Sequence, residues 1–224
     1  MDGKIVGCGI SILHGIISWL GAIIVLPEYR KRGIGKEITC HLVSYCKSKG
    51  CTTQLLIASE MGEPLYTKIG FEISSTYTFY KNESAISTQH ISNIRKVKPE
   101  DVQSIKEIDK EITGEERFVF LKKFISTGWI YESDKTKDVK GIYLPDIGSG
   151  LVIAKDANAG LTLMKLRLSL GKTSAIVPSK NTVACEYLIS QGFQEYRTVP
   201  RMVLGNDVLW QPTMLYNRGA GYCG

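Results

Sequence analysis

Histidine is scarce in this sequence, and its cysteines are never closely spaced. The 224 residues contain three histidines and six cysteines, and no two cysteines have the C-x-x-C spacing of a zinc or redox site. The sequence therefore predicts no metal site, and with no secretion signal it predicts reduced thiols in a cytoplasmic protein. The bulk composition, 43% apolar and 22% charged, excludes the disordered, collagen-like and coiled-coil classes.

Charge is missing between Lys4 and Glu28, where 15 of the 22 residues from Ile5 to Leu26 are apolar. Such a run is long enough to cross a bilayer. Four glycines interrupt it, however, and each costs a helix about 1 kcal/mol relative to alanine. The start of the chain also lacks the net positive charge of a signal peptide. The run therefore predicts two buried strands, about 4–13 and 16–26, with a turn at His14-Gly15, and no membrane partner.

Two common nucleotide-binding signatures are absent as well. A Walker loop needs glycine five positions before Gly-Lys-Thr, but Gly171-Lys172-Thr173 has Leu166 there. The Rossmann fingerprint fails because Ile38 stands where its last glycine is required. These two ways of binding nucleotide phosphates are therefore excluded.

A basic loop with two glycines follows the second predicted strand. Pro27 ends that strand, and apolar residues then recur at helical spacing from Ile34 to Gly50. Free amides at a helix start and close backbone approach at glycine suit a phosphate group. Positive charge is added by Arg30, Lys31, Arg32 and Lys36. The pattern predicts a phosphate site; the alternative is a solvated basic turn.

Two motifs in this region resemble those of one superfamily. Arg30-x-x-Gly33-x-Gly35 resembles the acetyl-CoA-binding loop of the GCN5-related N-acetyltransferases (GNAT). One predicted strand later, at 53–58, comes Leu65-Tyr66-Thr67-Lys68-Ile69-Gly70-Phe71, which resembles the superfamily's L-Y-x-K-x-G-F signature. The resemblance implies an α+β fold with a mixed sheet of the α/β type.

The resemblance also implies roles for individual residues. Acetyl-CoA would be the co-substrate, with its pantetheine arm on the backbone of residues 24–26 and its pyrophosphate on the amides of residues 30–36. Tyr66 would be the catalytic acid that protonates the departing thiolate; the alternative is that its ring only packs against the helix. No general base is assigned, although Glu60 and Glu63 lie near the second motif. The implied cofactor-binding residues are Ile24, Val25, Leu26, Arg30, Lys31, Arg32, Gly33, Ile34, Gly35 and Lys36.

The second half of the chain reads as a degenerate copy of the same fold. After the polar segment 84–92, Ile94-Arg95 and Asp101 match the "I-R-x-x-x-x-x-D" opening of superfamily members. Tyr187–Phe193 repeats Leu65–Phe71, but Leu188 replaces Tyr66, and residues 155–160 lack the glycine loop. We expect strands at 94–97, 129–132, 141–144, 151–154 and 174–177, and helices after Pro99, at 118–125, at 161–170 and after Asn181.

These patterns predict a tandem protein of two GNAT-like domains. The first, 1–83, holds the acyl-CoA-binding loop but lacks the strand and two helices that usually precede the hairpin, which puts activity in doubt more than cofactor binding. Residues 84–92 form a linker, and 93–224 form the C-terminal domain, which has lost cofactor binding.

The predicted activity is transfer of an acetyl group to a primary amine by direct attack. The amine belongs to a small molecule or a peptide, and assembly is left open, with a homodimer as one alternative. The rival hypothesis is a non-catalytic acyl-CoA-binding or scaffolding protein. A nucleic-acid-binding module would suit the net charge of +6, but no basic stripe with interleaved aromatics supports it, and we expect no nucleic-acid partner.

Overall fold

The chain forms two compact units that each draw on both halves of the sequence. The computed structural model describes residues 3–84 and 91–221, so most of the predicted linker lies outside the described residues. Unit 1 comprises Met1–Ser74 and Val199–Val208, and unit 2 comprises Ser75–Thr198 and Leu209–Gly224. Strands β4 (Glu72–Lys81) and β10 (Gln194–Gly205) contribute residues to both units. The domain limits 1–83 and 93–224 stay a prediction.

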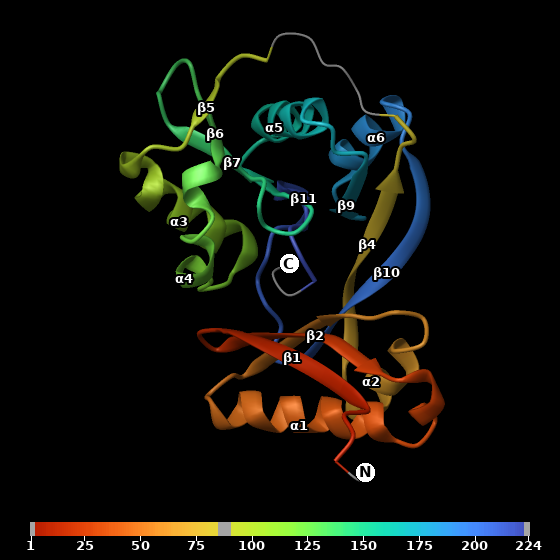
Figure 1. Cartoon of the computed structure of the whole chain (residues 1–224). Coiled ribbons are helices and arrows are strands. Elements are labelled where there is room, and N and C mark those ends of the chain that lie inside the picture. The colour runs from red at the N-terminus through yellow and green to blue at the C-terminus, as the bar shows by residue number, and fades with distance from the viewer. Residues whose placement is uncertain (1–2, 85–90, 222–224) are drawn as a thin grey trace. The chain divides into compact units, whose positions relative to one another are not determined.

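Unit 1 is a mixed sheet with helices (Figure 1). Its sheet has the order β1-β2-β3-β10, in which β1 and β2 are antiparallel, β2 and β3 parallel, and β3 and β10 antiparallel. The elements are β1 (Gly7–His14), β2 (Ile17–Val25), a 3-10 turn (Pro27–Tyr29), α1 (Ile34–Ser48), β3 (Thr53–Ile57) and α2 (Glu63–Ile69). The two strands expected from the charge-free run are thus present as a hairpin.

Two of the glycines of that run, Gly7 and Gly9, are explained by the packing of α1 on the hairpin. A Cβ on Gly9 would stand 2.8 Å from Ile38 Cγ2 and 2.9 Å from Leu42 Cδ1, both on α1. Glycine therefore lets the helix lie closer to the strand than any other residue would. Among the described residues, no helix is both long enough and apolar enough to span a bilayer.

Unit 2 contains a second, antiparallel sheet of order β11-β8-β7-β6-β5, and β4 pairs antiparallel with β9. Its strands are β5 (Ile94–Lys96), β6 (Trp129–Glu132), β7 (Val139–Leu144), β8 (Leu151–Ala154), β9 (Ser174–Pro178) and β11 (Leu215–Asn217). Its helices are α3 (Val102–Thr113), α4 (Phe118–Leu121), α5 (Ala157–Ser169) and α6 (Thr182–Ser190). The α+β class with mixed sheets is confirmed.

One predicted helix is wrong in extent. The apolar spacing favoured a helix over 118–125, but α4 ends at Leu121 and a separate 3-10 turn covers Ile125–Thr127. Leu121 and Ile125 are both buried. Two short helical turns thus bury the apolar side chains that one continuous helix was expected to bury. Sequence reasoning also missed β4, β10 and β11.

Candidate functional site

The site of unit 1 begins where β2 and β3 part. The two strands pair only at Ile17–Trp19 with Thr53–Leu55, although β2 continues to Val25. The β1-β2 register also shifts by one residue between Cys8 and Ile10, and Ala22 there has a φ of 48°. Such a bulge bends a strand. The end of β2 is thus free of its parallel neighbour.

A cavity of about 490 Å³ lies beside this free end. Apolar side chains from the end of β2, from α1 and from the segment around α2 form much of its wall. The loop before α1 and the first turn of that helix supply cations and glycines. The lining residues are Ile23, Ile24, Val25, Tyr29, Arg30, Lys31, Gly33, Ile34, Gly35, Lys36, Ser59, Met61, Gly62, Leu65 and Tyr66.

The first turn of α1 presents unpaired amides to this cavity. Gly33 is the N-cap, in the left-handed conformation with φ of 82°, and no side chain caps the helix. The first helical bond runs from Glu37 N to Gly33 O at 3.1 Å. The amides of residues 34–36 therefore have no acceptor within the helix, and together with the helix dipole they favour an anion.

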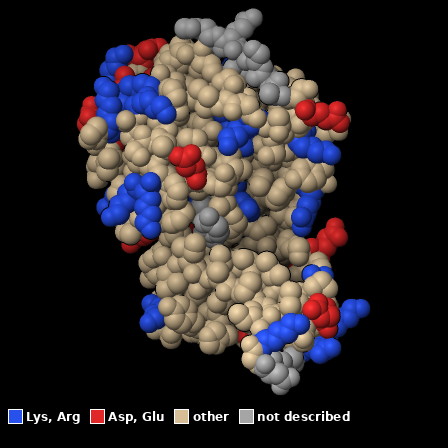
Figure 2. Space-filling model, viewed as in Figure 1, with Lys and Arg blue, Asp and Glu red and all other residues tan. Residues whose placement is uncertain are grey.

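The loop itself is held in place by its own side chains. Arg30 Nε donates to the carbonyl oxygen of Val25 at 3.0 Å, which ties the loop to the end of β2. Lys4 Nζ and the Arg32 guanidinium each lie 5.3 Å from the centroid of the Tyr29 ring. Figure 2 shows several Lys and Arg side chains, with Asp or Glu side chains among them, at the end of unit 1 where this turn lies. The rim of the cavity is thus positively charged.

Tyr66 reaches the same cavity from α2. A Cβ on Gly62 would stand 2.8 Å from Tyr66 Cε2, so glycine makes room for the ring. The ring also packs edge-on against Phe71, with centroids 6.0 Å apart. Burial raises the pKa of Tyr66 above its ordinary value of 10, which keeps the phenol protonated across neutral pH. Tyr66 is therefore a protonated acid lining the cavity.

The structure brings most of the implied residues together. Of the ten implied cofactor-binding residues all but Leu26 and Arg32 line the cavity, as does Tyr66. Glu60 and Glu63 do not line it. Sequence reasoning missed the other six lining residues, of which Leu65 stands within the quoted motif and Gly62 precedes it. The roles assigned to these residues stay predictions.

The chemistry of the cavity fits an acyl-CoA. Apolar walls around Ile24, Val25 and Leu65 suit an extended pantetheine arm. The unpaired amides of the first turn of α1 and the nearby Arg30, Lys31 and Lys36 suit a pyrophosphate. Within the described residues, no three His, Cys, Asp or Glu side chains are grouped so as to hold a metal ion.

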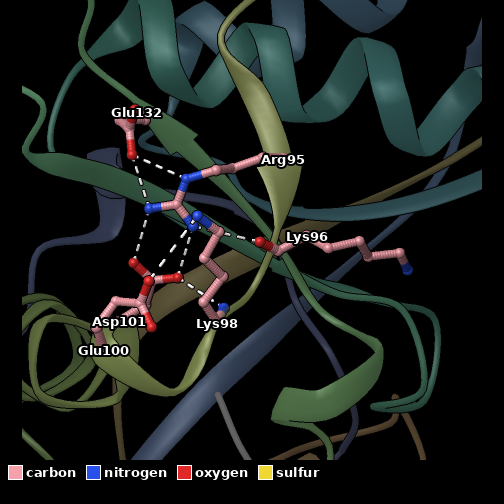
Figure 3. Close-up of polar contacts among 6 residues, drawn as sticks. All are labelled: Arg95, Lys96, Lys98, Glu100, Asp101 and Glu132. Atoms are coloured by element: carbon pink, nitrogen blue, oxygen red, sulfur yellow. Dashed lines mark hydrogen bonds and ion pairs between the residues drawn. The ribbon is translucent and has the colours of Figure 1, made fainter.

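The opening motif of the second half has a structural role in unit 2. Arg95 on β5 donates to both carboxylate oxygens of Asp101, at 2.7 and 2.9 Å, and to Glu132 on β6 at 2.8 Å (Figure 3). Asp101 also accepts from the backbone amide of Lys98 at 2.7 Å. The ion pair of Arg95 and Asp101, together with Glu132, thus connects β5, β6 and the start of α3. The hydrogen bonds from the Arg95 guanidinium lower the pKa of Asp101. This effect outweighs burial, which on its own would raise the pKa.

We expect Asp101→Asn to lower the free energy of unfolding by about 2 kcal/mol at pH 7, because hydrogen bonds to charged groups contribute ~1.5–3 kcal/mol. The pKa of Asp101 is lower in the folded than in the unfolded chain, so this stabilisation is present above the unfolded pKa and is lost as pH falls through the folded one. Urea titrations from pH 7 to pH 2 should therefore show wild type losing stability more steeply than the variant. Parallel curves would contradict this role. Glu100→Gln, which removes only an exposed contact to Lys98 at 3.8 Å, is the control.

Part of the chain matches a known family of domains. Residues 1–73 match the family model described as an acetyltransferase (GNAT) domain. Over 207 residues the chain is 23% identical to the uncharacterised N-acetyltransferase YitH of Bacillus subtilis, covering 87% of this chain and 72% of the relative.

Solved structures extend the likeness to the fold of the whole chain. A candidate acetyltransferase from Pyrococcus horikoshii has a TM-score of 0.85 at 23% identity, covering 98% of this chain and 76% of that one. A tandem GNAT protein from the clavulanic acid biosynthesis pathway has a TM-score of 0.60 at 14% identity, covering 92% and 80%. Residues 1–73 thus match a GNAT acetyltransferase domain, and the solved structures show that the chain shares its fold with such proteins.

Proposed function

We propose that this protein is an N-acyltransferase that uses acetyl-CoA and a primary amine, and that the reaction takes place in unit 1. One observation carries the proposal: the cavity beside the end of β2 holds both the uncapped start of α1 and the protonated Tyr66. An anion-binding helix start suits the pyrophosphate of an acyl-CoA, and a proton donor in the same cavity suits the departing thiolate.

The residues of the cavity divide the work between binding and proton transfer. When bound, acetyl-CoA supplies a thioester carbonyl at which the amine forms a C–N bond while the C–S bond breaks. The apolar walls of the cavity exclude water from the pantetheine arm, and the amides of Gly35 and Lys36 orient the pyrophosphate. Tyr66 holds a proton at its phenol oxygen for the departing sulfur, and the proton that the amine loses passes to solvent. The acceptor is a primary amine on a small molecule or a peptide.

A turnover assay over a panel of amines tests the proposal. Purified protein is mixed with acetyl-CoA and, in separate wells, an amino acid, a polyamine, an aminoglycoside or a short peptide, and release of the free thiol is followed. We expect at least one amine to raise thiol release above the amine-free blank, with the acetylated amine found by mass spectrometry. Binding of acetyl-CoA without release across the panel would favour the rival, a non-catalytic acyl-CoA-binding protein.

A further inference from the structure

The two units share one succession of elements. In unit 1, β2, α1 and β3 are followed by α2 with the motif Leu65–Phe71; in unit 2, β8, α5 and β9 are followed by α6 with the related Tyr187–Phe193. In unit 1 the first strand and the helix start border the cavity. The corresponding place in unit 2 is the gap between β8 and β9 beside the start of α5.

The chain's own strand β11 fills that gap. On one side it pairs antiparallel with β8, with Leu215 opposite Ile153 and Asn217 opposite Val152. On the other side it bonds to Ile176 of β9: Asn217 Oδ1 accepts from the Ile176 amide at 2.9 Å, and the next amide along, of Arg218, donates to the Ile176 carbonyl at 2.8 Å. β11 therefore joins the two strands, and all three of its residues are buried.

The start of α5 is closed in the same way. Asp156 caps this helix, and its Oδ1 accepts from the amide of Ala159 at 2.9 Å. A Cβ on Gly160 would overlap the ring of Tyr216 from β11. In unit 1, by contrast, α1 has no side-chain cap, and a Cβ on Gly35 would make only ordinary contacts at 3.6 and 3.8 Å. A carboxylate and an aromatic ring thus stand at the start of α5, and a carboxylate there repels an anion.

Buried polar groups also hold β11 in place. Arg167 on α5 is fully buried and donates to the carbonyl oxygens of Ser149, shortly before β8, and of Ser174, the first residue of β9. Ser149 Oγ donates in turn to the carbonyl of Arg218 at 2.8 Å. The side-chain amide of Asn217 donates to Ser149 Oγ at 3.2 Å and to the carbonyl of Gly150. Contacts that involve β8, β9 and α5 therefore fix β11 within unit 2.

We infer that β11 is an internal plug, a strand of the chain that occupies in unit 2 the place of the unit 1 cavity, so that the protein binds one acyl-CoA per chain. The stoichiometry of one acyl-CoA per chain rests on the proposed function of unit 1. The position of β11 between β8 and β9 is independent of that function, since all the contacts of β11 described above lie within unit 2.

Titration calorimetry with CoA itself tests the stoichiometry. We expect one site per chain in the wild type and none in the double variant Gly33→Val/Gly35→Leu, which blocks the unit 1 cavity. Two sites in the wild type, or one site remaining in the double variant, would overturn the plug. If the wild type binds no CoA at all, the proposed function fails, and the plug is then decided by the next measurement.

Hydrogen exchange of the wild-type chain reports on β11 without any ligand. Peptides spanning residues 215–218 should exchange about 10³-fold or more slowly than an unstructured peptide of the same sequence. We expect the same protection for peptides of β8, because both strands lie in one core. Exchange of residues 215–218 within the first seconds, with β8 protected, would show that the segment leaves the gap readily and would overturn the inference.

Discussion

Replacing Tyr66 with Phe is expected to lower kcat by about 10²–10⁴-fold, the usual contribution of a positioned general acid. The phenol oxygen is lost, while the ring keeps its edge-on contact with Phe71 and its place beside Gly62. Affinity for CoA should change little, because binding rests on the start of α1 and the cavity walls. Steady-state kinetics with the best amine of the panel, together with calorimetry, separate the two effects.

The control for this variant is Tyr187→Phe. Tyr187 belongs to the repeated motif of unit 2, and burial raises the pKa of its phenol as well, but it does not line the unit 1 cavity. We expect wild-type kinetics for this variant. Full activity of Tyr66→Phe would show that the Tyr66 ring serves packing alone.

Replacing Asp109 with Ala is expected to lower the free energy of unfolding by about 3–5 kcal/mol, because the buried Arg117 guanidinium loses three hydrogen bonds to a carboxylate. Asp109 on α3 accepts three hydrogen bonds from Arg117, from Nε at 3.0 and 3.1 Å and from Nη2 at 2.7 Å. The two side chains are 2% and 0% exposed. Chemical denaturation followed by far-UV circular dichroism measures the loss.

A neighbouring pair supplies the control. Lys110 and Glu116 connect the same two stretches of chain at 2.9 Å, but both are well exposed. Exposed ion pairs contribute little to stability, so Glu116→Ala should leave the denaturation midpoint nearly unchanged. A similar loss in both variants would contradict the assignment of the stabilisation to the buried pair.

The site was predictable from the sequence because its signals are local. The glycine loop, the helix after it and the motif around Tyr66 are each set by residues only a few positions apart, and the cavity joins eight of the ten implied cofactor-binding residues. The hairpin was predictable for the same reason, since glycines in the charge-free run argued against a spanning helix. The wall residues Ser59 and Met61 carry no comparable local signal.

The rest depends on contacts between distant parts of the chain. Arg201–Gly205 of β10 pairs with Thr53–Ile57 of β3, across about two thirds of the sequence, and β11 consists of three residues only. Neither strand has a local pattern that says where it will insert. Loss of the glycine loop predicted that the second copy binds no cofactor, but the strand that fills the gap appears only in the fold.

Calorimetric titration of acetyl-CoA into the wild type and into Gly33→Val/Gly35→Leu tests most directly that unit 1 binds an acyl-CoA through the start of α1. The side chains added at positions 33 and 35 would keep the pyrophosphate away from the amides of the first turn. Loss of two such contacts to a charged group, at ~1.5–3 kcal/mol each, should weaken binding about 100-fold or more. Gly171→Val is the matched control, because Gly171 also has a positive φ (83°) and open space around it but lies outside the cavity. The prediction is that wild type and Gly171→Val bind alike and that the double variant binds about 100-fold more weakly or worse. Absence of binding in the wild type, or equal binding in all three, would contradict it.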